Sequence, residues 1–485
     1  RLIKLLLKMK EGYIKKEDRK KILLLTDDIR VHSGVATVGR EIVTNTAHRY
    51  NWVQLAGAIK HPEKEKVVDL SKATGEKLGI DDASVLLYPC DHYGNPDLLR
   101  DVIKREKIDA LFLITDPRYF EWVFQMENEI RSLIPIAYLN IWDDLPAPMY
   151  NRDFYDSCDA LFGISKQTKN INEIVLGKER CKNKVIKYIP HGLDHNIFKP
   201  INKFDKEYQK LVESLSKDGK MEFKLLFNSR NIRRKCIPDT ILAWKYFLDT
   251  LSKEKRSKCQ LVLHTTPIDD HGTDIPEVIN FLFPENDHNI VISPNKFTTE
   301  QMSYLYNYAD GTILLSSAEG WGLALTESLL TGTPIIANVT GGMQDQMRFT
   351  DEKGKWIEFN KNFPSNHNGT YRDCGEWALP VYPTNKSLVG SPRTPYIWDD
   401  RCNPEDAAKQ IKALYDMGDK ERKRVGKIGR NWVLGDEAGF TAEKMSNKVI
   451  NGMDELFKKF KPKPNFTFTK DTDIDKKVLN HKLIY

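Results

Sequence analysis

Short hydrophobic runs alternate along the chain with longer amphipathic stretches, and this pattern predicts strands and helices in turn. The first clear strand covers residues 21–26 (KILLLT), and Val35, Val38 and Ile42 then follow at helical spacing. Strand–helix alternation of this kind favours a parallel sheet with helices on both faces. Further strands of this first series are expected at residues 52–58, 84–89, 109–115, 135–142, 160–165 and 184–192, and helices at 96–107 and 120–133.

A second series of the same kind follows a charged, proline-containing segment at residues 198–210, which is typical of a linker between domains. A chain of 485 residues is also too long for one ordinary hydrophobic core. We therefore expect two consecutive doubly wound α/β domains, at residues 21–200 and 201–440. The strands of the second domain are expected at residues 223–229, 259–265, 289–294, 311–317 and 333–339.

Residues 360–403 interrupt this rhythm. They have little periodicity and many Pro, Gly and Asn residues, which predicts an irregular insertion in the second domain. Their aromatic residues favour an ordered segment over a disordered one. Helical spacing returns at residues 404–418, a last helix is expected at 441–460, and residues 461–485 form a tail.

The composition is that of a soluble globular protein, with 40% hydrophobic and 29% charged residues. No apolar run approaches the roughly 20 residues that a membrane-spanning helix needs. The seven cysteines are scattered without paired short spacings, which favours free thiols in a reducing compartment over a disulfide frame or a zinc site. We therefore expect a cytoplasmic protein.

The net charge of +6 is a local property of the start of the chain. Residues 1–21 hold nine Lys and Arg against three acidic residues, which leaves 65 basic and 65 acidic residues elsewhere. The folded body therefore has no general preference for polyanions. Leu2, Leu6 and Met9 would share one face of a helix, with basic residues on another. This basic leader, residues 1–20, fits either a helix on an anionic membrane surface or a segment packed on the body.

The first candidate site is the glycine-containing turn at residues 31–42 (VHSGVATVGREI). Gly34 and Gly39 stand between a predicted strand and a predicted helix, where backbone amides and the helix start can hold an anion. The turn has neither the Walker pattern nor the dinucleotide-binding fingerprint. Close packing of the backbone is the alternative interpretation.

The second candidate site contains Arg230 and Lys235, five residues apart and just past a predicted strand. Two cations at the start of a helix could neutralise a diphosphate together with the helix dipole. A solvated basic turn is the alternative, and the neighbouring Arg233 and Arg234 fit it.

The third candidate site is the stretch at residues 316–337 (SSAEGWGLALTESLLTGTPIIA), in which Glu319 and Glu327 lie eight residues apart. Gly320 and Gly322 allow close approach of a ligand, and free amides at a helix start suit a phosphate or a sugar hydroxyl. Carboxylates are good acceptors for the vicinal hydroxyls of a ribose or hexose. The alternative is one glutamate that complements the helix dipole and one that is merely exposed.

In their order along the chain, these motifs resemble the retaining GT-B glycosyltransferases of family 4. Glu319 and Glu327 match the Glu-x7-Glu motif of the family, and Arg230 and Lys235 match its Arg-x4-Lys spacing. The resemblance covers about residues 21–360 and 403–460, and it includes the segments HSGVATVGREI (32–42), NIWDDLP (140–146), GISKQT (163–168) and IPHGLDHNIFKP (189–200).

The resemblance implies a GT-B fold, in which two Rossmann-like domains face each other across a cleft and the last helix crosses back to the first domain. It implies transfer of a sugar from a nucleotide-diphosphate sugar to an acceptor hydroxyl, with retention at the anomeric carbon and without a metal or other cofactor. The N-terminal domain would bind the acceptor and the C-terminal domain the donor.

The resemblance also assigns roles to individual residues. Arg230 and Lys235 would bind the diphosphate and stabilise the charge of the leaving group. Glu327 would bind the ribose, and Glu319 the transferred sugar. The donor site implied in this way consists of Gly34, Arg230, Lys235, Glu319, Gly320, Trp321, Gly322, Leu323 and Glu327.

The sequence departs from the family pattern in the N-terminal half. Val35 stands where a second glycine is usual, and His191 replaces the usual Asn at the junction of the domains, where it could face the cleft or be structural. The usual catalytic-side histidine is not obvious. Asp116, Asp143 and Asp144 lie in that region, and we select Asp143 and Asp116 as candidates to assist the acceptor.

The acceptor stays open among a glycan, a lipid and a modified DNA base. A lipid would suit the basic leader. The segments TDPRYFEW (115–122) and NIWDDLPAPMYN (140–151) resemble transferases encoded by large phages, which adds the modified base. Two other classes fit the same motifs, a GT-B epimerase that acts on the donor itself and a non-catalytic protein that binds a sugar nucleotide.

Overall fold

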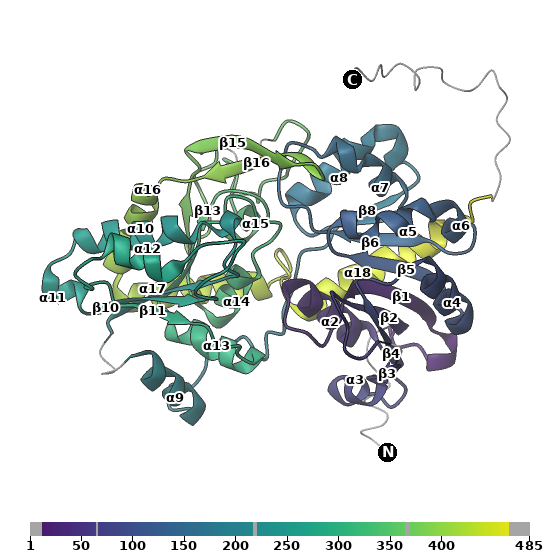
Figure 1. The fold of residues 1–485 in the computed structure, drawn as a ribbon, viewed down its shortest axis with the longest axis horizontal. Coiled ribbons are helices and arrows are strands. Elements are labelled where there is room, and N and C mark those ends of the chain that lie inside the picture. Colours follow the sequence, from purple (N-terminus) through teal and green to yellow (C-terminus); the bar gives the residue numbers. More distant parts are fainter. Residues whose placement is uncertain (1–11, 65, 217–220, 364–368, 465–485) are drawn as a thin grey trace.

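The computed structural model describes residues 12–64, 66–216, 221–363 and 369–464, which form two α/β lobes side by side (Figure 1). Each lobe has its own sheet with helices packed on it, as the strand–helix alternation predicts. None of the helices in the described segments has the length and apolar character needed to span a membrane.

The N-terminal lobe contains an eight-stranded sheet in the order β3-β4-β2-β1-β5-β6-β7-β8, parallel except for β3. Its strands are β1 (Lys20–Asp27), β2 (Tyr50–Ala58), β3 (Val68–Asp69), β4 (Val85–Asp91), β5 (Ala110–Ile114), β6 (Ile136–Asn140), β7 (Ala160–Gly163) and β8 (Val185–Tyr188). Residues 22–25 of the central strand β1 are completely buried, as a continuous hydrophobic run in a parallel sheet requires. The pattern predicted every strand of this sheet except the short β3.

The helices of this lobe are α2 (Gly34–Thr46), α3 (Ser71–Leu78), α4 (Pro96–Glu106), α5 (Glu121–Gln125), α6 (Glu127–Arg131), α7 (Arg152–Asp156) and α8 (Lys166–Cys181). Local signals explain their limits, as in α4, where the Asn95 side chain accepts from two amides of the first turn and Pro96 occupies the first helical position. One helix predicted at 120–133 is instead three short pieces, η2 (Pro117–Phe120), α5 and α6.

The C-terminal lobe contains a six-stranded, fully parallel sheet in the order β11-β10-β9-β12-β13-β14. Its strands are β9 (Phe223–Asn228), β10 (Cys259–His264), β11 (Ile290–Ser293), β12 (Gly311–Leu314), β13 (Ile335–Asn338) and β14 (Ala378–Val381). Its helices are α9 (Lys206–Leu215), η4 (Arg233–Lys235), α10 (Ile237–Asp249), α11 (Lys253–Arg256), α12 (Ile275–Leu282), α13 (Thr299–Tyr308), α14 (Leu323–Thr331), α15 (Met343–Met347), α16 (Pro404–Asp416) and α17 (Gly418–Leu434).

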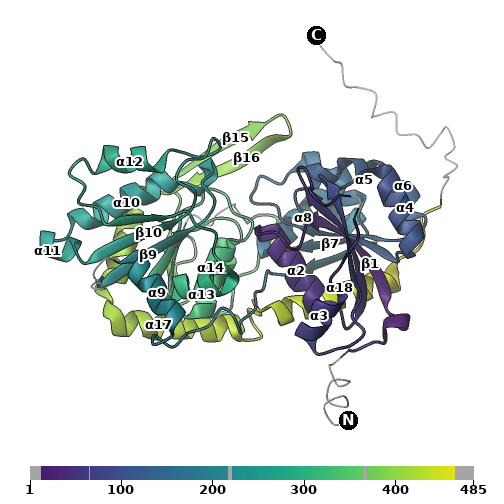
Figure 2. The ribbon, with the colours of Figure 1, turned by 60° about the horizontal axis from the view of Figure 1, so that its bottom comes forward.

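The segment predicted as an irregular insertion, residues 360–403, is more regular than expected. It supplies the edge strand β14 and an antiparallel hairpin of β15 (Asn385–Ser391) and β16 (Thr394–Arg401). Figure 2 shows the hairpin extending from the C-terminal lobe towards the N-terminal lobe. The hydrophobic pattern does not predict β15, because this strand is exposed throughout and therefore has no alternation of buried and exposed positions.

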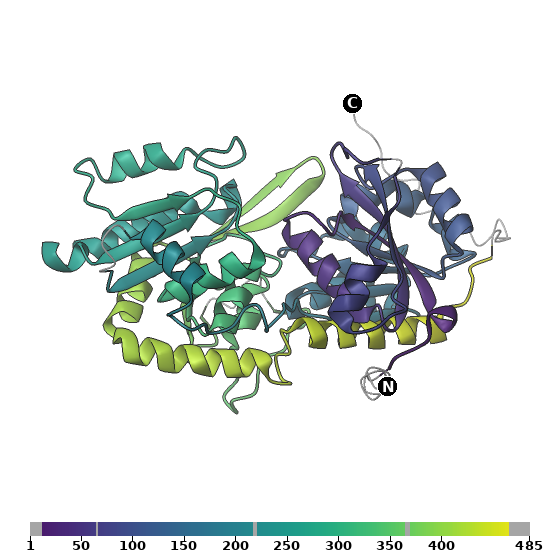
Figure 3. The same ribbon diagram turned by 90° about the horizontal axis from the view of Figure 1, so that it is seen from below.

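The last helix, α18 (Ala442–Lys459), lies against the N-terminal lobe, whereas α17 lies along the C-terminal lobe (Figure 3). The Asp454 carboxylate of α18 accepts from the Arg49 guanidinium at 2.7 Å and from the Tyr50 hydroxyl at 2.9 Å. The chain therefore returns to its first lobe after it has completed the second.

Both ends of the chain extend beyond the described residues. Residues 1–11 of the predicted leader and residues 465–485 of the predicted tail lie outside them. The first described residues pack on the N-terminal lobe, where the Tyr13 hydroxyl donates to Asp82 at 2.7 Å and Arg19 pairs with the same carboxylate at 2.6 Å.

Candidate active site

The loop between β12 and α14 contains Glu319, and Glu327 follows it on the helix. The helix begins after Gly322, which adopts φ +84°, and no side chain caps its first amides. These amides are therefore available to an anion, and the helix dipole favours one there. The helix ends at Gly332, again at positive φ, so glycines define both of its limits.

Two cations from the neighbouring loop after β9 meet Glu319. Lys235, on η4, forms an ion pair with the Glu319 carboxylate, and Arg234 donates to the same oxygen at 3.2 Å. Arg234 also donates to the carbonyl of Ala318 at 2.8 Å, which ties η4 to the β12–α14 loop. We call Arg234, Lys235 and Glu319 the α14 cluster.

Two cations of the α14 cluster share one buried carboxylate, and Asp143 of the N-terminal lobe lies 3.8 Å from Arg234. Burial disfavours the charged form of Glu319, but Lys235 and Arg234 outweigh it and lower its pKa to about 2. Burial and the adjacent Arg234 lower the pKa of Lys235 despite its ion pair. A further anion at this place would stabilise the charged form of Lys235.

Glu327 lies further along α14, in a different environment. Its Oε2 accepts from the Tyr306 hydroxyl at 2.5 Å and from Asn228 Nδ2 at 3.4 Å, and no cation pairs with it among the described residues. Burial raises its pKa to about 7, although Tyr306 and Asn228 oppose the rise. The two glutamates of one motif thus have opposite pKa shifts.

Arg230 lies just past the end of β9, with an exposed side chain that forms no ion pair within the described segments. Its guanidinium is therefore free to meet a ligand, whereas Arg234 is engaged by Glu319. Of the two predicted cations, Lys235 is thus in the cluster, and Arg230 precedes it in the same loop. Arg234 belonged only to the alternative of a solvated basic turn, and nothing in the spacing indicated that it would meet Glu319.

The start of α2 in the N-terminal lobe meets the start of α14. A methyl group added at Gly34 would lie 3.4 Å from Leu323 Cδ1, so these two predicted site residues are neighbours across the lobes. The first turn of α2 is already capped, since the Ser33 hydroxyl accepts from the amide of Ala36 at 3.0 Å. The amides of α14 are consequently the freer of the two sets.

Other glycines of the site contact backbone, and this explains why they are glycines. A side chain on Gly320 would lie 2.6 Å from the carbonyl oxygen of Ile141, and one on Gly341 would lie 1.9 Å from that of Glu319. Gly320 also donates its amide to Asp143 Oδ1 at 3.1 Å. The loops of the two lobes therefore touch through their main chains at this point.

Of the three predicted carboxylates in the N-terminal lobe, Asp143 is the one that reaches the α14 cluster. It accepts from Gly320 and lies 3.8 Å from Arg234, and burial raises its pKa despite the pull of Arg234. Asp116 caps η2 and pairs with Arg118. Asp144 is fully buried and accepts from Leu145, Gln167 and Thr340.

Trp321 and His191 belong to the core. The Trp321 ring is 2% exposed, donates to the Thr326 hydroxyl at 2.9 Å and meets Phe440 edge-on at a centroid distance of 4.9 Å. The Trp321 side chain is thus packed in the core, and its contact with a donor stays a prediction. His191 packs edge-on against Trp321 at 6.0 Å, and burial lowers its pKa to about 3, so its imidazole is neutral.

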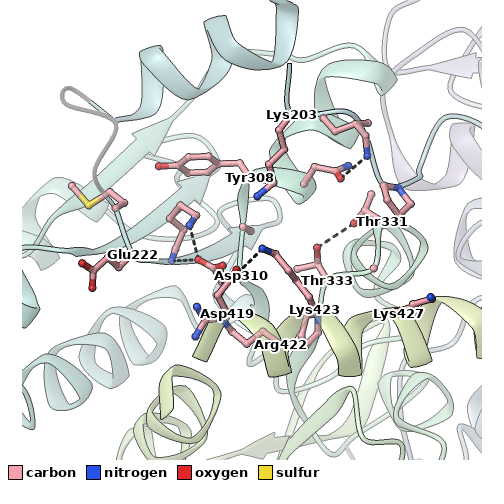
Figure 4. Close-up of a pocket in the computed structure, with 18 of the residues that line it drawn as sticks. Lys203, Glu222, Tyr308, Asp310, Thr331, Thr333, Asp419, Arg422, Lys423 and Lys427 are labelled. Carbon is pink, nitrogen blue, oxygen red and sulfur yellow. Dashed lines mark hydrogen bonds and ion pairs between the residues drawn. The ribbon is translucent and has the colours of Figure 1, made fainter. Parts of the chain in front are cut away.

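A large pocket of about 1110 Å³ lies in the C-terminal lobe, apart from the α14 cluster (Figure 4). Its lining residues Lys224, Asp310 and Pro334 lie at the amino ends of strands β9, β12 and β13, at the edge of the sheet opposite the α14 cluster. Asp310 is neutralised there by Lys224 at 2.7 Å. None of the predicted site residues lines this pocket.

The described part of the chain contains no group of three or more His, Cys, Asp or Glu side chains placed to hold a metal ion. The seven cysteines are free thiols, five of them buried.

Part of the sequence is similar to a known protein family. Residues 285–363, which include both Glu319 and Glu327, match the family described as glycosyl transferases group 1. No curated protein matches the sequence of the chain significantly.

Solved structures resemble the whole fold. A glycosyltransferase from Rickettsia africae has a TM-score of 0.60 at 16% identity, over 91% of this chain and 99% of that one. Anabaena HepE in complex with UDP and glucose has 0.61 at 14% identity, over 90% and 100%. Sucrose-phosphate synthase from Thermosynechococcus elongatus has 0.61 at 15% identity, over 91% and 100%.

These similarities fix the architecture, because both lobes are covered in each comparison. The expected fold class is confirmed: the lobes are two Rossmann-like domains arranged as in the GT-B glycosyltransferases. The chain has the GT-B fold, and residues 285–363 of its C-terminal lobe are similar to the glycosyl transferases group 1.

Proposed function

We propose that the protein transfers a sugar from a nucleoside-diphosphate sugar to an acceptor hydroxyl, with retention at the anomeric carbon and without a metal ion. The observation that carries this proposal is the α14 cluster. Buried Lys235 and half-buried Arg234 stand beside the uncapped start of α14, and the exposed Arg230 precedes them in the same loop. These cations and amides suit a diphosphate, which would compete with Glu319 and Asp143 for them.

The chemistry follows from these charges. The bond between the anomeric carbon and the phosphate oxygen breaks, and the negative charge that develops on the leaving diphosphate is stabilised by Lys235, Arg230 and the amides of Gly322 and Leu323. Since fixed cations and amides supply this stabilisation, a metal ion is not needed. A diphosphate bound there also competes for Lys235 and frees Glu319 to accept from hydroxyls of the transferred sugar.

The remaining residues complete the proposal. Glu327, held by Tyr306 and Asn228, accepts from the ribose hydroxyls. Asp143 takes the proton of the acceptor hydroxyl as the new bond to the anomeric carbon forms, and its raised pKa suits a base. One structural neighbour, Anabaena HepE, was solved with UDP and glucose, with UDP and with UDP-glucose, which makes a uridine donor the first choice to test.

The first test is binding. UDP-glucose, UDP-N-acetylglucosamine and GDP-mannose are compared by thermal unfolding, and we expect one of them to raise the melting temperature by several degrees at about 100 times its Kd. The same nucleotide sugar is then incubated with the protein in the absence of an acceptor. Slow release of free sugar supports a transferase, whereas recovery of an epimerised sugar, or no stabilisation by any nucleotide sugar, would overturn the proposal.

A further inference from the structure

The β15–β16 hairpin leaves the C-terminal lobe after β14 and reaches the N-terminal lobe (Figures 1 and 2). The contacts that it makes there are close and polar. We propose that this hairpin positions the segment 143–150 of the N-terminal lobe and thereby holds Asp143 against Gly320 and Arg234. The structural part of this inference is independent of the reaction, and its catalytic consequence rests on the proposed function.

The contacts come from alternate positions of β16. The residues at every second place from Thr394 to Asp400 meet the N-terminal lobe or the loops beneath it, as the two-residue period of a strand requires. Thr394 accepts from the Arg118 guanidinium, and the Tyr396 hydroxyl accepts from the Met149 amide at 3.1 Å. Thr394, Tyr396 and Trp398 thus contact the N-terminal lobe, and Asp400 contacts loops of its own lobe beneath the hairpin.

Tyr396 is the centre of this contact. Its hydroxyl also lies 3.3 Å from the carbonyl oxygen of Ala147, its own carbonyl accepts from the Tyr150 hydroxyl at 2.8 Å, and the two tyrosine rings meet edge-on at 4.8 Å. The Trp398 amide then donates to the carbonyl of Leu145 at 2.9 Å. Four residues of the segment 143–150 are therefore held through their main chains or rings.

The base of the hairpin reaches the residue next to Asp143. The fully buried Asp400 carboxylate accepts from the Thr340 hydroxyl at 2.8 Å, and Asp144 of the N-terminal lobe lies 3.2 Å from the same hydroxyl. The Asp400 amide donates to the carbonyl of Ser317, in the loop that leads to Glu319. The hairpin thus joins the segment of Asp143 to the loop of the α14 cluster.

The hairpin contacts that hold segment 143–150 determine where the Asp143 carboxylate lies. Asp143 is half-buried and has only Gly320 and Arg234 as polar neighbours at its carboxylate among the interactions described above. Its place therefore depends on the path of the main chain on either side. With the hairpin contacts removed, this path is set by the N-terminal lobe alone.

The test uses the double variant T394V/Y396F in the full-length protein. The two substitutions nearly keep the size of the side chains and keep the edge-on ring contact of residue 396 with Tyr150, but they remove the hydroxyls that meet Arg118, Ala147 and Met149. The matched control is S387A on the exposed strand β15, where the hydroxyl bonds only to Asn385 within the hairpin. Measurements are amide hydrogen exchange and release of glucose from UDP-glucose without an acceptor.

We expect about tenfold faster exchange of the amides at 143–150 in the double variant, since two or three hydrogen bonds are lost. Turnover of UDP-glucose should fall about tenfold while the Kd of UDP-glucose, from calorimetry, stays within about twofold. The S387A control should behave as the wild type in all three measurements.

Two results would overturn the proposal. Unchanged exchange at 143–150 would mean that the hairpin does not hold this segment. Equal losses of donor affinity and turnover would mean that the hairpin only stabilises the contact between the lobes. If the wild type binds no nucleotide sugar, the proposed function fails, and the exchange measurement still decides the role of the hairpin.

Discussion

The α14 cluster and the segment 143–150 are both parts of the candidate site, but they are assembled in different ways. The α14 cluster comes from two loops of one lobe, and its residues are tied to each other by charge. Segment 143–150 is held by the hairpin of the other lobe, through main-chain groups and aromatic rings. The residues of the α14 cluster position one another within one lobe. Segment 143–150 depends instead on hairpin residues about 250 positions away in the chain.

This difference has a physical consequence. Ion pairs within one lobe persist whatever the second lobe does, because the sheet fixes the loops that carry them. Contacts between lobes persist only while the lobes are together. We therefore expect substitutions in the α14 cluster to affect donor chemistry directly, and substitutions at the contact of the lobes to act through position.

The largest effect is expected from Lys235→Ala. This substitution removes the buried ammonium that would stabilise the leaving diphosphate, and turnover of a nucleotide sugar should fall about 10²–10³-fold. The control is Arg233→Ala, a neighbouring exposed arginine of η4, which should stay within about twofold. Full turnover in Lys235→Ala, measured by release of the nucleotide, would contradict the assignment of the leaving-group site.

The next-largest expected effect is on the free energy of unfolding, and it should differ between Glu319→Gln and Glu327→Gln. Glu319→Gln leaves Lys235 buried without its carboxylate, so the free energy of unfolding at pH 7 should fall by about 3 kcal/mol. Glu327→Gln should cost much less at this pH, because burial has already raised the pKa of Glu327 to about 7 and Tyr306 and Asn228 bind a neutral amide as well. Urea unfolding of both variants measures the difference, and equal losses would contradict it.

The pH dependence has opposite signs at the two sites. The folded-state pKa of Glu319, about 2, is below its ordinary value of 4.5, so its contribution to stability is present above pH 4.5 and is lost as the pH falls towards 2. The pKa of Glu327 is raised from 4.5 to about 7, so its contribution is present below pH 4.5 and is lost as the pH rises through 7. Glu327→Gln should therefore reduce the loss of stability between pH 5 and pH 8, measured by urea unfolding across that range.

The sequence predicted most of the fold because buried parallel strands are continuous hydrophobic runs. All the strands of the two sheets were found in this way except β3, which has only two residues, and β14, whose four residues include a proline. The motif of Glu319 and Glu327 was equally visible, since both residues are set by the geometry of one loop and helix. The surroundings of Trp321 could not be predicted, because a tryptophan between two glycines has the same pattern whether it meets a ligand or packs in the core.

The contacts of the hairpin and the position of the Arg234 side chain could not be predicted from the sequence, for other reasons. The contacts of Tyr396 and Trp398 join residues about 250 positions apart, and no local pattern records which segments meet. Arg234 differs from Arg233 only in the direction of its side chain, which the turn of η4 decides. Both cases depend on tertiary packing, and a single sequence contains no direct signal of it.

A smaller effect is expected from Gly320→Ala, which tests the contact between the lobes because it adds only a methyl group there. The added methyl group would lie 2.6 Å from the carbonyl oxygen of Ile141, so one of the two loops must move. We expect a loss of about 1–3 kcal/mol in the free energy of unfolding and faster amide exchange at residues 141–145. Gly34→Ala is the control, because its methyl group would stand in ordinary contact with Leu323 at 3.4 Å. Equal exchange in the two variants would mean that the loops do not press on each other there.

The smallest effect is expected from Trp321→Phe, and it decides whether the residue between the two glycines belongs to the donor site or to the core. The substitution removes the hydrogen bond from the indole to Thr326 and part of the contact with Phe440 and His191. We expect a loss of about 1–2 kcal/mol in the free energy of unfolding. The Kd of UDP-glucose should stay within about twofold, because the ring is buried in the core and packs on Phe440 and His191. A large loss of donor affinity at unchanged stability would place the Trp321 ring in the donor site, and the α14 cluster would then extend into the junction of the two lobes.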